Sequence, residues 1–296
     1  MFTLAQISDV HLAPVALPKL SGLTLKQAIG LANWLRARRH LHLRSVLDSI
    51  VDDMKAQRPD HIAVTGDLVN MGLPSEQIDA LGWLKSLGPP GRVTAIPGNH
   101  DIYGRTGRDP GIERWRPYME GQDPGESRGF PFVKTIGRIA IVGTSSAVPT
   151  PPFFATGRLG EGQLRALGER LASLGQSGYC RVLLIHHPPL PGQADRMRGL
   201  TDARNLAALL SRTGAELVLH GHNHRPMLAF AAGPTGPIPV VGAPSASARA
   251  GVHDPGAGYN LFHIGQQAGR CHIELIRRGY DGTGQIVEIE RRELLA

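Results

Sequence analysis

Five short apolar runs of this sequence end directly in side chains that bind metal ions or carry protons. The residues that follow these runs are Asp9 and His11, Asp67, Asn99 with His100 and Asp101, His186 with His187, and His220 with His222 and His224. Carboxylate oxygens, imidazole nitrogens and an amide oxygen suit hard or borderline divalent and trivalent ions, and no thiolate is among them. We therefore expect a centre for two ions that share a carboxylate and a hydroxide and together polarise a phosphoryl group.

The spacing of these residues lets neighbouring side chains reach the same ion. Asp9 and His11 lie two positions apart, as do His222 and His224. Alternate side chains of an extended segment point to the same side, so each pair can contact one ion. A glycine precedes Asp67 at a turn, which leaves the carboxylate free of a neighbouring Cβ and suits it to a bridging position.

Strands that alternate with helices are expected to position these side chains. Apolar runs predict strands at 2–7, 61–65, 93–96, 180–185 and 215–219. Apolar residues at helical spacing predict helices at 44–57, 75–87, 163–174 and 202–212. In the helix 75–87 we expect Ser75 as the cap and Ile78, Leu81 and Leu84 on one face. Such alternation indicates βαβ units and a largely parallel sheet.

The second half of the chain follows a different pattern. A short helix within a long loop is expected at 102–129, and a hairpin at 132–136 and 138–142. Short strands without intervening helices are predicted at 227–231, 238–241, 259–264, 271–276 and 285–289. The chain thus begins as α/β and ends as antiparallel β, an order that two packed sheets flanked by helices satisfy.

Residues 13–43 interrupt what would otherwise be a strand-to-helix connection. This insertion is predicted to be mostly helical, with an amphipathic portion at 25–35 and a basic stretch at 34–42. It lies next to the first pair of metal-binding side chains. One interpretation is a cap whose arginines are solvated; the other is a surface that receives an anionic substrate or docks on anionic lipid.

Composition places broad limits on the protein. With 296 residues, 41% of them apolar, residues 1–296 are expected to form a single domain. Cys180 and Cys271 belong to no metal-binding pair and are expected to be buried reduced thiols. No signal peptide and no long apolar segment is recognisable, which predicts a cytoplasmic protein. The net charge of +7 suits an anionic substrate or surface.

The order of these motifs resembles that of the calcineurin-like metallophosphoesterases. The shared pattern is Asp-x-His, Gly-Asp, Gly-Asn-His-Asp, a histidine after an apolar strand, and Gly-His-x-His, over residues 2 to about 230. Within this family, the motifs Asn99-His100-Asp101 and His222-x-His224 and the chain length are most similar to those of the bacterial cyclic-nucleotide and glycerophosphodiester phosphodiesterases. It implies a four-layer αββα sandwich, in which two mixed β-sheets are flanked by helices.

The resemblance also implies a role for each motif residue. It places Asp9, His11 and His224 at one ion, Asn99, His186 and His222 at the other, and Asp67 between them. His100 would steady the phosphoryl oxygens or protonate the leaving alkoxide, and Asp101 would orient His100. The ligand after the fourth strand is expected to be His186, with His187 as the alternative.

The other histidines and two arginines lie outside these motifs. His220 is expected to be a core imidazole, and His40, His42, His61, His253, His263 and His272 to be ordinary. Arg105 and Arg108 could contact phosphate or belong to a solvated loop.

The expected activity is that of a metal-dependent phosphodiesterase. The resemblance implies in-line attack by a hydroxide that bridges two ions, with manganese, iron or zinc as the metals, on cyclic nucleotides or other small phosphodiesters. Nucleic acid is a disfavoured substrate, because the related nucleases usually have longer chains with capping and coiled-coil parts. The oligomeric state is left open, a dimer included.

Two alternatives compete with this expectation. The first is a hydrolase of a lipid-linked phosphoester or pyrophosphate, with peripheral membrane contact through 13–43. The second is a non-catalytic metal-binding scaffold, which should have lost ligands, whereas every ligand position is filled here.

Overall fold

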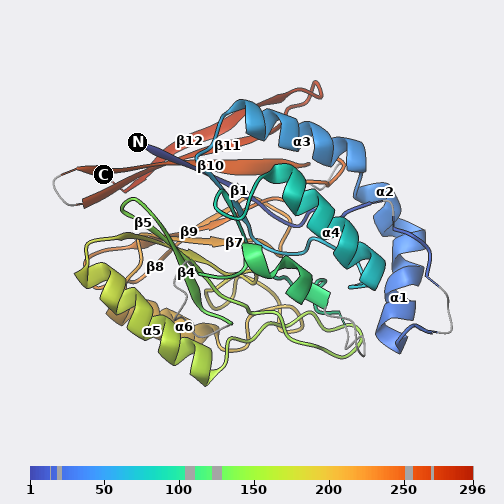
Figure 1. Cartoon of the computed structure of the whole chain (residues 1–296), viewed down its shortest axis with the longest axis horizontal. Coiled ribbons are helices and arrows are strands. Elements are labelled where there is room, and N and C mark those ends of the chain that lie inside the picture. The colour runs from blue at the N-terminus through green and yellow to red at the C-terminus, as the bar shows by residue number, and fades with distance from the viewer. Residues whose placement is uncertain are drawn as a thin grey trace.

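Two six-stranded sheets pack face to face and carry helices on their outer faces (Figure 1). The computed structural model describes residues 1–13, 15–18, 22–103, 111–121, 129–250, 256–267 and 270–295. Helices α3 and α4 cover one side of the sandwich, and α5 and α6 cover the other (Figure 1). The expected four-layer arrangement of two mixed sheets and flanking helices is confirmed.

The first sheet has the order β12-β11-β10-β1-β2-β3. Its strands are β1 (Phe2–Ile7), β2 (His61–Val64), β3 (Val93–Ala95), β10 (Gly258–Gln267), β11 (Arg270–Tyr280) and β12 (Ile286–Leu295). β1, β2 and β3 are parallel, and β10 joins the other edge of β1 in the antiparallel direction. The carboxyl ends of β1, β2 and β3 therefore meet at one edge of the sheet.

The second sheet has the order β4-β5-β6-β7-β9-β8. Its strands are β4 (Phe132–Ile136), β5 (Ile139–Gly143), β6 (Cys180–Leu184), β7 (Leu217–His220), β8 (Met227–Ala231) and β9 (Ile238–Gly242). The hairpin of β4 and β5 is confirmed. The expectation that all late strands are antiparallel is wrong for β9, which runs parallel to β7 because β8 intervenes in the chain and forms the edge of the sheet.

The helices mostly lie where apolar periodicity predicts them. They are α1 (Leu25–Asn33), α3 (Arg44–Ala56), α4 (Pro74–Leu87), α5 (Glu161–Gln176) and α6 (Ala203–Thr213), with a π-helix at Trp34–Arg38, a short α2 (Arg39–Leu41) and a 3₁₀ helix at Gly111–Tyr118. The insertion 13–43 is thus helical, as expected, over its described residues from Leu25 to Leu41.

Helix α4 departs from the prediction in its start and in its buried face. It begins at Pro74, one residue before the expected cap Ser75, and Glu76 holds its first turn by accepting from the backbone N–H of Leu73 at 3.0 Å. Ile78 is 55% exposed, because the buried face is formed by Ala80, Trp83, Leu84 and Leu87. Glycines and polar residues in this helix blur its periodicity.

Strand alternation divides the core of the sandwich into two parts. Val182 and Leu184 of β6 face inward to the core between the sheets. Leu183 faces outward, where it packs in a second core with residues of α5 and α6 such as Leu167 and Leu206. Burial on both faces explains why the inner strands read as continuous apolar runs.

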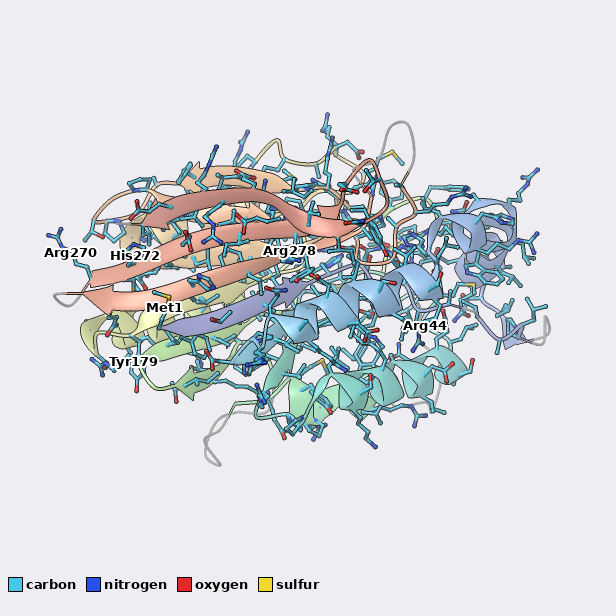
Figure 2. All side chains as sticks on the ribbon, turned by 90° about the horizontal axis from the view of Figure 1, so that it is seen from above. Met1, Arg44, Tyr179, Arg270, His272 and Arg278 are labelled. Atoms are coloured by element: carbon cyan, nitrogen blue, oxygen red, sulfur yellow. The ribbon has the colours of Figure 1, made fainter. Side chains whose placement is uncertain are left out.

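The two cysteines lie on different sheets and are both free thiols. Cys180 on β6 is buried, as expected, whereas Cys271 on β11 is only partly buried. Met1, Tyr179, Arg270 and His272 mark the end of the molecule opposite the insertion (Figure 2). Among the described residues, no helix combines the length and apolar character needed to cross a membrane.

Candidate metal centre

The predicted site residues follow the carboxyl ends of parallel strands from both sheets. Asp9, Asp67 and Asn99 follow β1, β2 and β3, and His186 and His222 follow β6 and β7. Open sheets collect ligands at this edge, because the loops that leave neighbouring parallel strands converge there. The insertion with α1 and α2 lies at the same end of the sandwich (Figure 1).

Several of these residues have backbone conformations that are rare outside glycine. Seven described non-glycine residues have positive φ, and five of them are predicted metal ligands, namely Asp9 (51°), His11 (40°), Asp67 (54°), His222 (71°) and His224 (56°). Each such conformation costs about 1–3 kcal/mol and persists only where surrounding contacts fix it. Their concentration at one site is typical of a functional centre.

Two glycines allow the loops to approach each other. A Cβ at Gly98 would overlap the carboxylate of Asp67, and a Cβ at Gly221 would overlap the hydroxyl of Ser8 and lie 2.5 Å from Asp9 Oδ2. Glycine is therefore required at both positions by the closeness of the neighbouring carboxylates.

The first set of converging atoms comes from Asp9, His11, Asp67 and His224. His224 Nε2 lies 3.3 Å from Asp9 Oδ1 and 3.2 Å from His11 Nε2, and His11 Nε2 lies 3.9 Å from Asp67 Oδ2. The potential ligand atoms of all four lie within 4.8 Å of one another.

The second set comes from Asp67, Asn99, His186 and His222. His186 Nε2 lies 3.4 Å from Asp67 Oδ2 and 3.2 Å from Asn99 Oδ1. His222 Nδ1 lies 2.9 Å from the same Asn99 oxygen. Asp67 belongs to both sets, which is the arrangement expected of a bridging carboxylate.

The hydrogen bonds of the imidazoles show that this donor set fits cations. His11 Nδ1 lies 3.1 Å from the carbonyl of Val69, and His186 Nδ1 lies 2.8 Å from the carbonyl of Thr65. A carbonyl oxygen can only accept, so each Nδ1 carries a proton, and in the neutral form of either ring Nε2 directs its lone pair into the site. Nitrogen lone pairs and carboxylate oxygens repel each other at these distances, and a cation bound between them would remove the repulsion.

The raised pKa of His186 also indicates that this site favours a positive charge. Burial lowers this pKa, but the carboxylate of Asp67 raises it more, and the net value is about 9. A proton on Nε2 would supply the positive charge that a metal ion supplies in a loaded site. Burial lowers the pKa values of His11 and His222, so these two rings favour the neutral form that metal binding requires.

His187 and His220 direct their ring nitrogens elsewhere. His187 Nδ1 lies 2.8 Å from the hydroxyl of Ser146, and its Nε2 lies 3.1 Å from the carbonyl of Ala155. Both nitrogens of His187 therefore have protein partners, and His186 is the histidine that faces Asp67. His220 is buried on β7, and its Nδ1 lies 3.1 Å from the carbonyl of Gly221.

The contacts of Asp101 differ from the expectation that it orients His100. Its carboxylate accepts from the backbone N–H groups of Asp67 (2.9 Å), Leu68 (2.8 Å), Val69 (3.1 Å) and Gly98 (2.8 Å). Asp101 therefore holds the loop that presents Asp67. The carbonyl of Asn70, 2.6 Å from His100 Nδ1, orients the imidazole instead.

His100 itself lies at the site, partly buried. Its backbone N–H donates to Asp67 Oδ1 at 2.8 Å, and its ring meets that of His11 edge-on with centroids 4.9 Å apart. Burial, with the positive charge of Arg38 adding to it, lowers the pKa of His100 to about 3. Arg105 and Arg108 lie outside the described residues.

The expectation that His42 is ordinary is wrong, because His42 lies at the centre together with Arg38 of the basic stretch 34–42. The ring centroid of His42 is 4.4 Å from that of His11, and Arg38 Nη1 is 3.1 Å from His100 Nδ1. The signal that points to them is the basic stretch 34–42 of the insertion, which one interpretation makes a surface for an anionic substrate.

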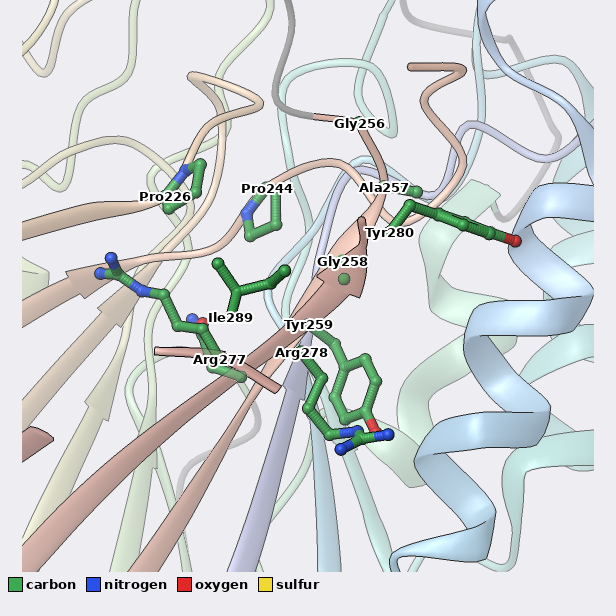
Figure 3. A pocket seen from close by; sticks show the side chains of 12 residues that line it. Pro226, Pro244, Gly256, Ala257, Gly258, Tyr259, Arg277, Arg278, Tyr280 and Ile289 are labelled. Carbon is green, nitrogen blue, oxygen red and sulfur yellow. The ribbon is translucent and has the colours of Figure 1, made fainter. Parts of the chain in front are cut away.

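A separate cavity lies where β10 begins, between residues of the first sheet and the loop residues Pro226 and Pro244 of the second (Figure 3). It has a volume of about 100 Å³ and is lined by residues such as Tyr259, Arg277 and Ile289. Ligand pockets usually have about 300–1,000 Å³, so this cavity is too small for a nucleotide.

Comparison with known proteins identifies the family of this chain. The family model described as calcineurin-like phosphoesterase matches residues 2–226. The chain is 30% identical over 180 residues to a probable cyclic nucleotide phosphodiesterase of Synechococcus sp., over 60% of this chain and 62% of that one. It is also 30% identical over 173 residues to the glycerophosphodiester phosphodiesterase GpdQ of Enterobacter lignolyticus, over 57% of each chain. The matches thus span less than two thirds of these relatives.

Solved structures share the fold at low sequence identity. A dimetal phosphatase from Danio rerio superposes with a TM-score of 0.67 at 14% identity, over 99% of this chain and 98% of that one. A purple acid phosphatase from yellow lupin (Lupinus luteus) superposes with a TM-score of 0.58 at 13% identity, over 97% of this chain and 52% of that one.

The segment matched by the family model contains all seven predicted metal ligands, from Asp9 to His224. It also contains every strand end that presents them. The chain belongs to the calcineurin-like phosphoesterase family.

Proposed function

We propose that this protein hydrolyses small phosphodiesters, cyclic nucleotides among them, at a centre of two metal ions. The observation that carries the proposal is the pair of ligand clusters that share Asp67. Membership of the family supports phosphoester hydrolysis, and the phosphodiesterase names of the two relatives support a diester substrate. The reaction adds water across a P–O bond and yields an alcohol and a phosphomonoester.

The residues proposed to hold the ions form two groups. Asp9, His11 and His224 serve one ion, Asn99, His186 and His222 serve the other, and Asp67 serves both. Nitrogen and oxygen donors without thiolate suit manganese, iron or zinc. Ions bound in this way polarise a phosphoryl group and make water nucleophilic at neutral pH.

The protein's own groups position the substrate and move the proton. We assign to His100 the contact with phosphoryl oxygens or with the leaving oxygen. Asn70 fixes its ring by accepting from Nδ1, which leaves Nε2 for the substrate. Asp101 contributes indirectly, because its four backbone hydrogen bonds hold the loop of Asp67.

The test is turnover of a diester against a monoester. The purified protein with Mn(II) is expected to hydrolyse bis(p-nitrophenyl) phosphate with a higher kcat/KM than p-nitrophenyl phosphate. Turnover of the monoester alone would contradict the diester preference. No turnover of either with Mn, Fe, Zn, Co or Ni would contradict the activity and favour a metal-binding scaffold.

A second candidate is hydrolysis of a lipid-linked phosphoester at a membrane surface. Leu25 of α1 is 72% exposed and Phe153 is 77% exposed. Their segments are adjacent, because Lys26 Nζ donates to the carbonyls of Thr150 at 3.0 Å and Phe154 at 3.4 Å. Exposed apolar side chains beside basic residues favour contact with anionic lipid.

Vesicle flotation separates the two candidates. If lipid is the substrate surface, the protein floats with vesicles of phosphatidylglycerol and phosphatidylcholine at low salt. The double variant Leu25→Ser with Phe153→Ser should then no longer float with the vesicles. The control Ile289→Ser, which alters an exposed residue of β12, should float like the wild type. Absence of flotation together with full activity on small diesters would exclude the membrane candidate.

A further inference from the structure

The C-terminal turn of the insertion is fixed against the metal centre by contacts with the loop that follows β9. Leu43 N–H donates to the carbonyl of Ser247 at 2.9 Å, and Arg249 N–H donates to the carbonyl of Leu41 at 2.7 Å. His42 forms an isolated antiparallel bridge with Ala248 between these two bonds. The position of this turn is therefore set by backbone pairing.

The start of the same segment is held by apolar packing. Leu31 and Trp34 are buried in a small cluster with Met71 and Leu73, which flank the loop of Asp67. The insertion is thus attached at one end to the residues that follow Asp67 and at the other to the loop after β9, and Arg38 and His42 lie near the second attachment.

His42 directs an unpartnered nitrogen toward the first ligand cluster. The residue is 1% exposed, and its Nδ1 lies 2.8 Å from the hydroxyl of Ser247. Its Nε2 is buried and has no hydrogen-bond partner among the described residues. An unsatisfied buried polar atom destabilises the fold, and a ligand on that atom would remove this cost.

The neighbours of His42 show what that ligand is. Its ring centroid lies 4.4 Å from that of His11 and 5.5 Å from that of His224. A ring nitrogen of each of the three histidines lies within 4.8 Å of the other two. Three convergent imidazoles, of which two are proposed ligands already, favour a borderline transition ion.

Arg38 presents a positive charge to the same centre, one turn earlier. Its Nη1 lies 3.1 Å from His100 Nδ1. That nitrogen already donates to the carbonyl of Asn70 at 2.6 Å, so it has no lone pair to offer the guanidinium. The guanidinium N–H groups of Arg38 therefore face the site and are suited to an anionic acceptor there.

We propose that the insertion is part of the active site, with Arg38 binding a non-bridging oxygen of the substrate phosphoryl group and His42 Nε2 acting as an additional ligand of the ion at Asp9, His11 and His224. The inference rests on the function proposed above. A guanidinium matches phosphoryl oxygens in charge and in the spacing of its donors. Arg38 and His100 then contact the same phosphoryl group.

Cobalt binding tests His42 without any need for activity. The insertion offers a matched control in His40, which is exposed two residues earlier. In a titration of metal-free protein with Co(II), His42→Ala is expected to weaken one of the two binding events at least about tenfold and to change its visible spectrum. His40→Ala should bind like the wild type, and His42→Gln controls for loss of side-chain volume.

The outcomes distinguish this inference from the proposed function. Wild-type affinity and spectrum in both His42 variants would overturn the additional ligand while leaving the two-ion centre intact. Failure of the wild-type protein to bind Co(II) at all would overturn both.

Phosphate binding tests Arg38, with exposed Arg36 as the matched control. Calorimetry of the Mn(II)-loaded protein with inorganic phosphate is expected to show binding about 10- to 100-fold weaker in Arg38→Ala than in Arg36→Ala. Added guanidinium ion should restore part of the loss, and Co(II) affinity should be unchanged in both variants. Equal phosphate affinity in the two variants would overturn the role of Arg38.

Discussion

At the scale of single residues, Asp67 joins the most interactions of the centre. Its Oδ2 faces histidines of both ligand sets, and its Oδ1 accepts from the backbone N–H of His100 at 2.8 Å. Residues from three other loops, His11, His186 and His100, therefore contact this one carboxylate. Loss of this group removes the shared ligand of both proposed ion positions.

We expect Asp67→Ala to abolish metal binding at both positions, because each ion loses a charged ligand and the repulsion between two adjacent cations is no longer screened. Elemental analysis after gel filtration measures the metal content directly. Asp79→Ala, which removes an exposed carboxylate on α4, is the matched control and should retain the wild-type content. One full equivalent of metal retained by Asp67→Ala would show that Asp67 does not bridge.

His100→Ala is expected to keep both ions and lower kcat by about 10²- to 10⁴-fold, the range typical of a lost proton donor or acceptor. His100 lies beside the two ligand sets but belongs to neither, so its loss should lower the rate and leave the metal content unchanged. Steady-state kinetics on bis(p-nitrophenyl) phosphate with parallel metal analysis checks this. Unchanged kcat would remove His100 from the mechanism.

At the scale of elements, hydrophobic periodicity predicts the strands and helices, because these depend on local burial. It does not predict contacts between segments that are distant in the sequence. The strands that end in Asp9, Asp67 and His186 were predicted, because apolar runs followed by polar ligands are visible in the sequence. The position of His42 could not be predicted, since it depends on backbone pairing with Ala248, some two hundred residues away. The role of Asp101 was mistaken because its partners are backbone N–H groups, which leave no trace in residue types.

Helix α3 is tied to the first sheet by a small polar network around Asp53. Arg278 of β11 donates to both carboxylate oxygens at 2.8 Å, and the hydroxyl of Tyr259 on β10 also donates to Asp53. Figure 3 shows Tyr259 and Arg278 side by side, pointing toward this helix. Burial disfavours the carboxylate, but these hydrogen bonds outweigh it and lower the pKa of Asp53.

We expect Asp53→Asn to reduce the free energy of unfolding by about 1–3 kcal/mol at pH 7, as for a lost charge-assisted hydrogen bond. Because the folded-state pKa is depressed, this stabilisation is present above the ordinary pKa of about 4 and is lost as pH falls through the folded-state value. Urea unfolding from pH 7 to pH 3 should therefore show the two proteins converging. Exposed Asp52, its neighbour on α3, supplies the control Asp52→Asn, and a difference independent of pH would contradict the argument.

At the scale of the whole molecule, the centre joins the two sheets at one edge of the sandwich. Asp9 follows the first sheet and accepts from the backbone N–H of His222, which follows the second, at 3.0 Å. Gln6 Nε2 donates to the carbonyl of His220 at 2.9 Å across the same boundary. Ions held by ligands from both sheets would therefore stabilise the packing of one sheet on the other, as well as the loops.

Metal binding should accordingly raise the stability of the whole fold. An ion at 100 times its Kd contributes about 2.7 kcal/mol per site if the unfolded chain does not bind it. In a chain of this length we expect Tm to rise by a few degrees on addition of Mn(II) to metal-free protein and to fall again with a chelator. Asp67→Ala should lose the shift, whereas His100→Ala should keep it, since only the first removes a ligand. A Tm that does not move at Mn(II) concentrations that saturate the sites by calorimetry would mean that the unfolded chain binds the ions as tightly as the folded protein does, which would contradict stabilisation of the fold by the centre.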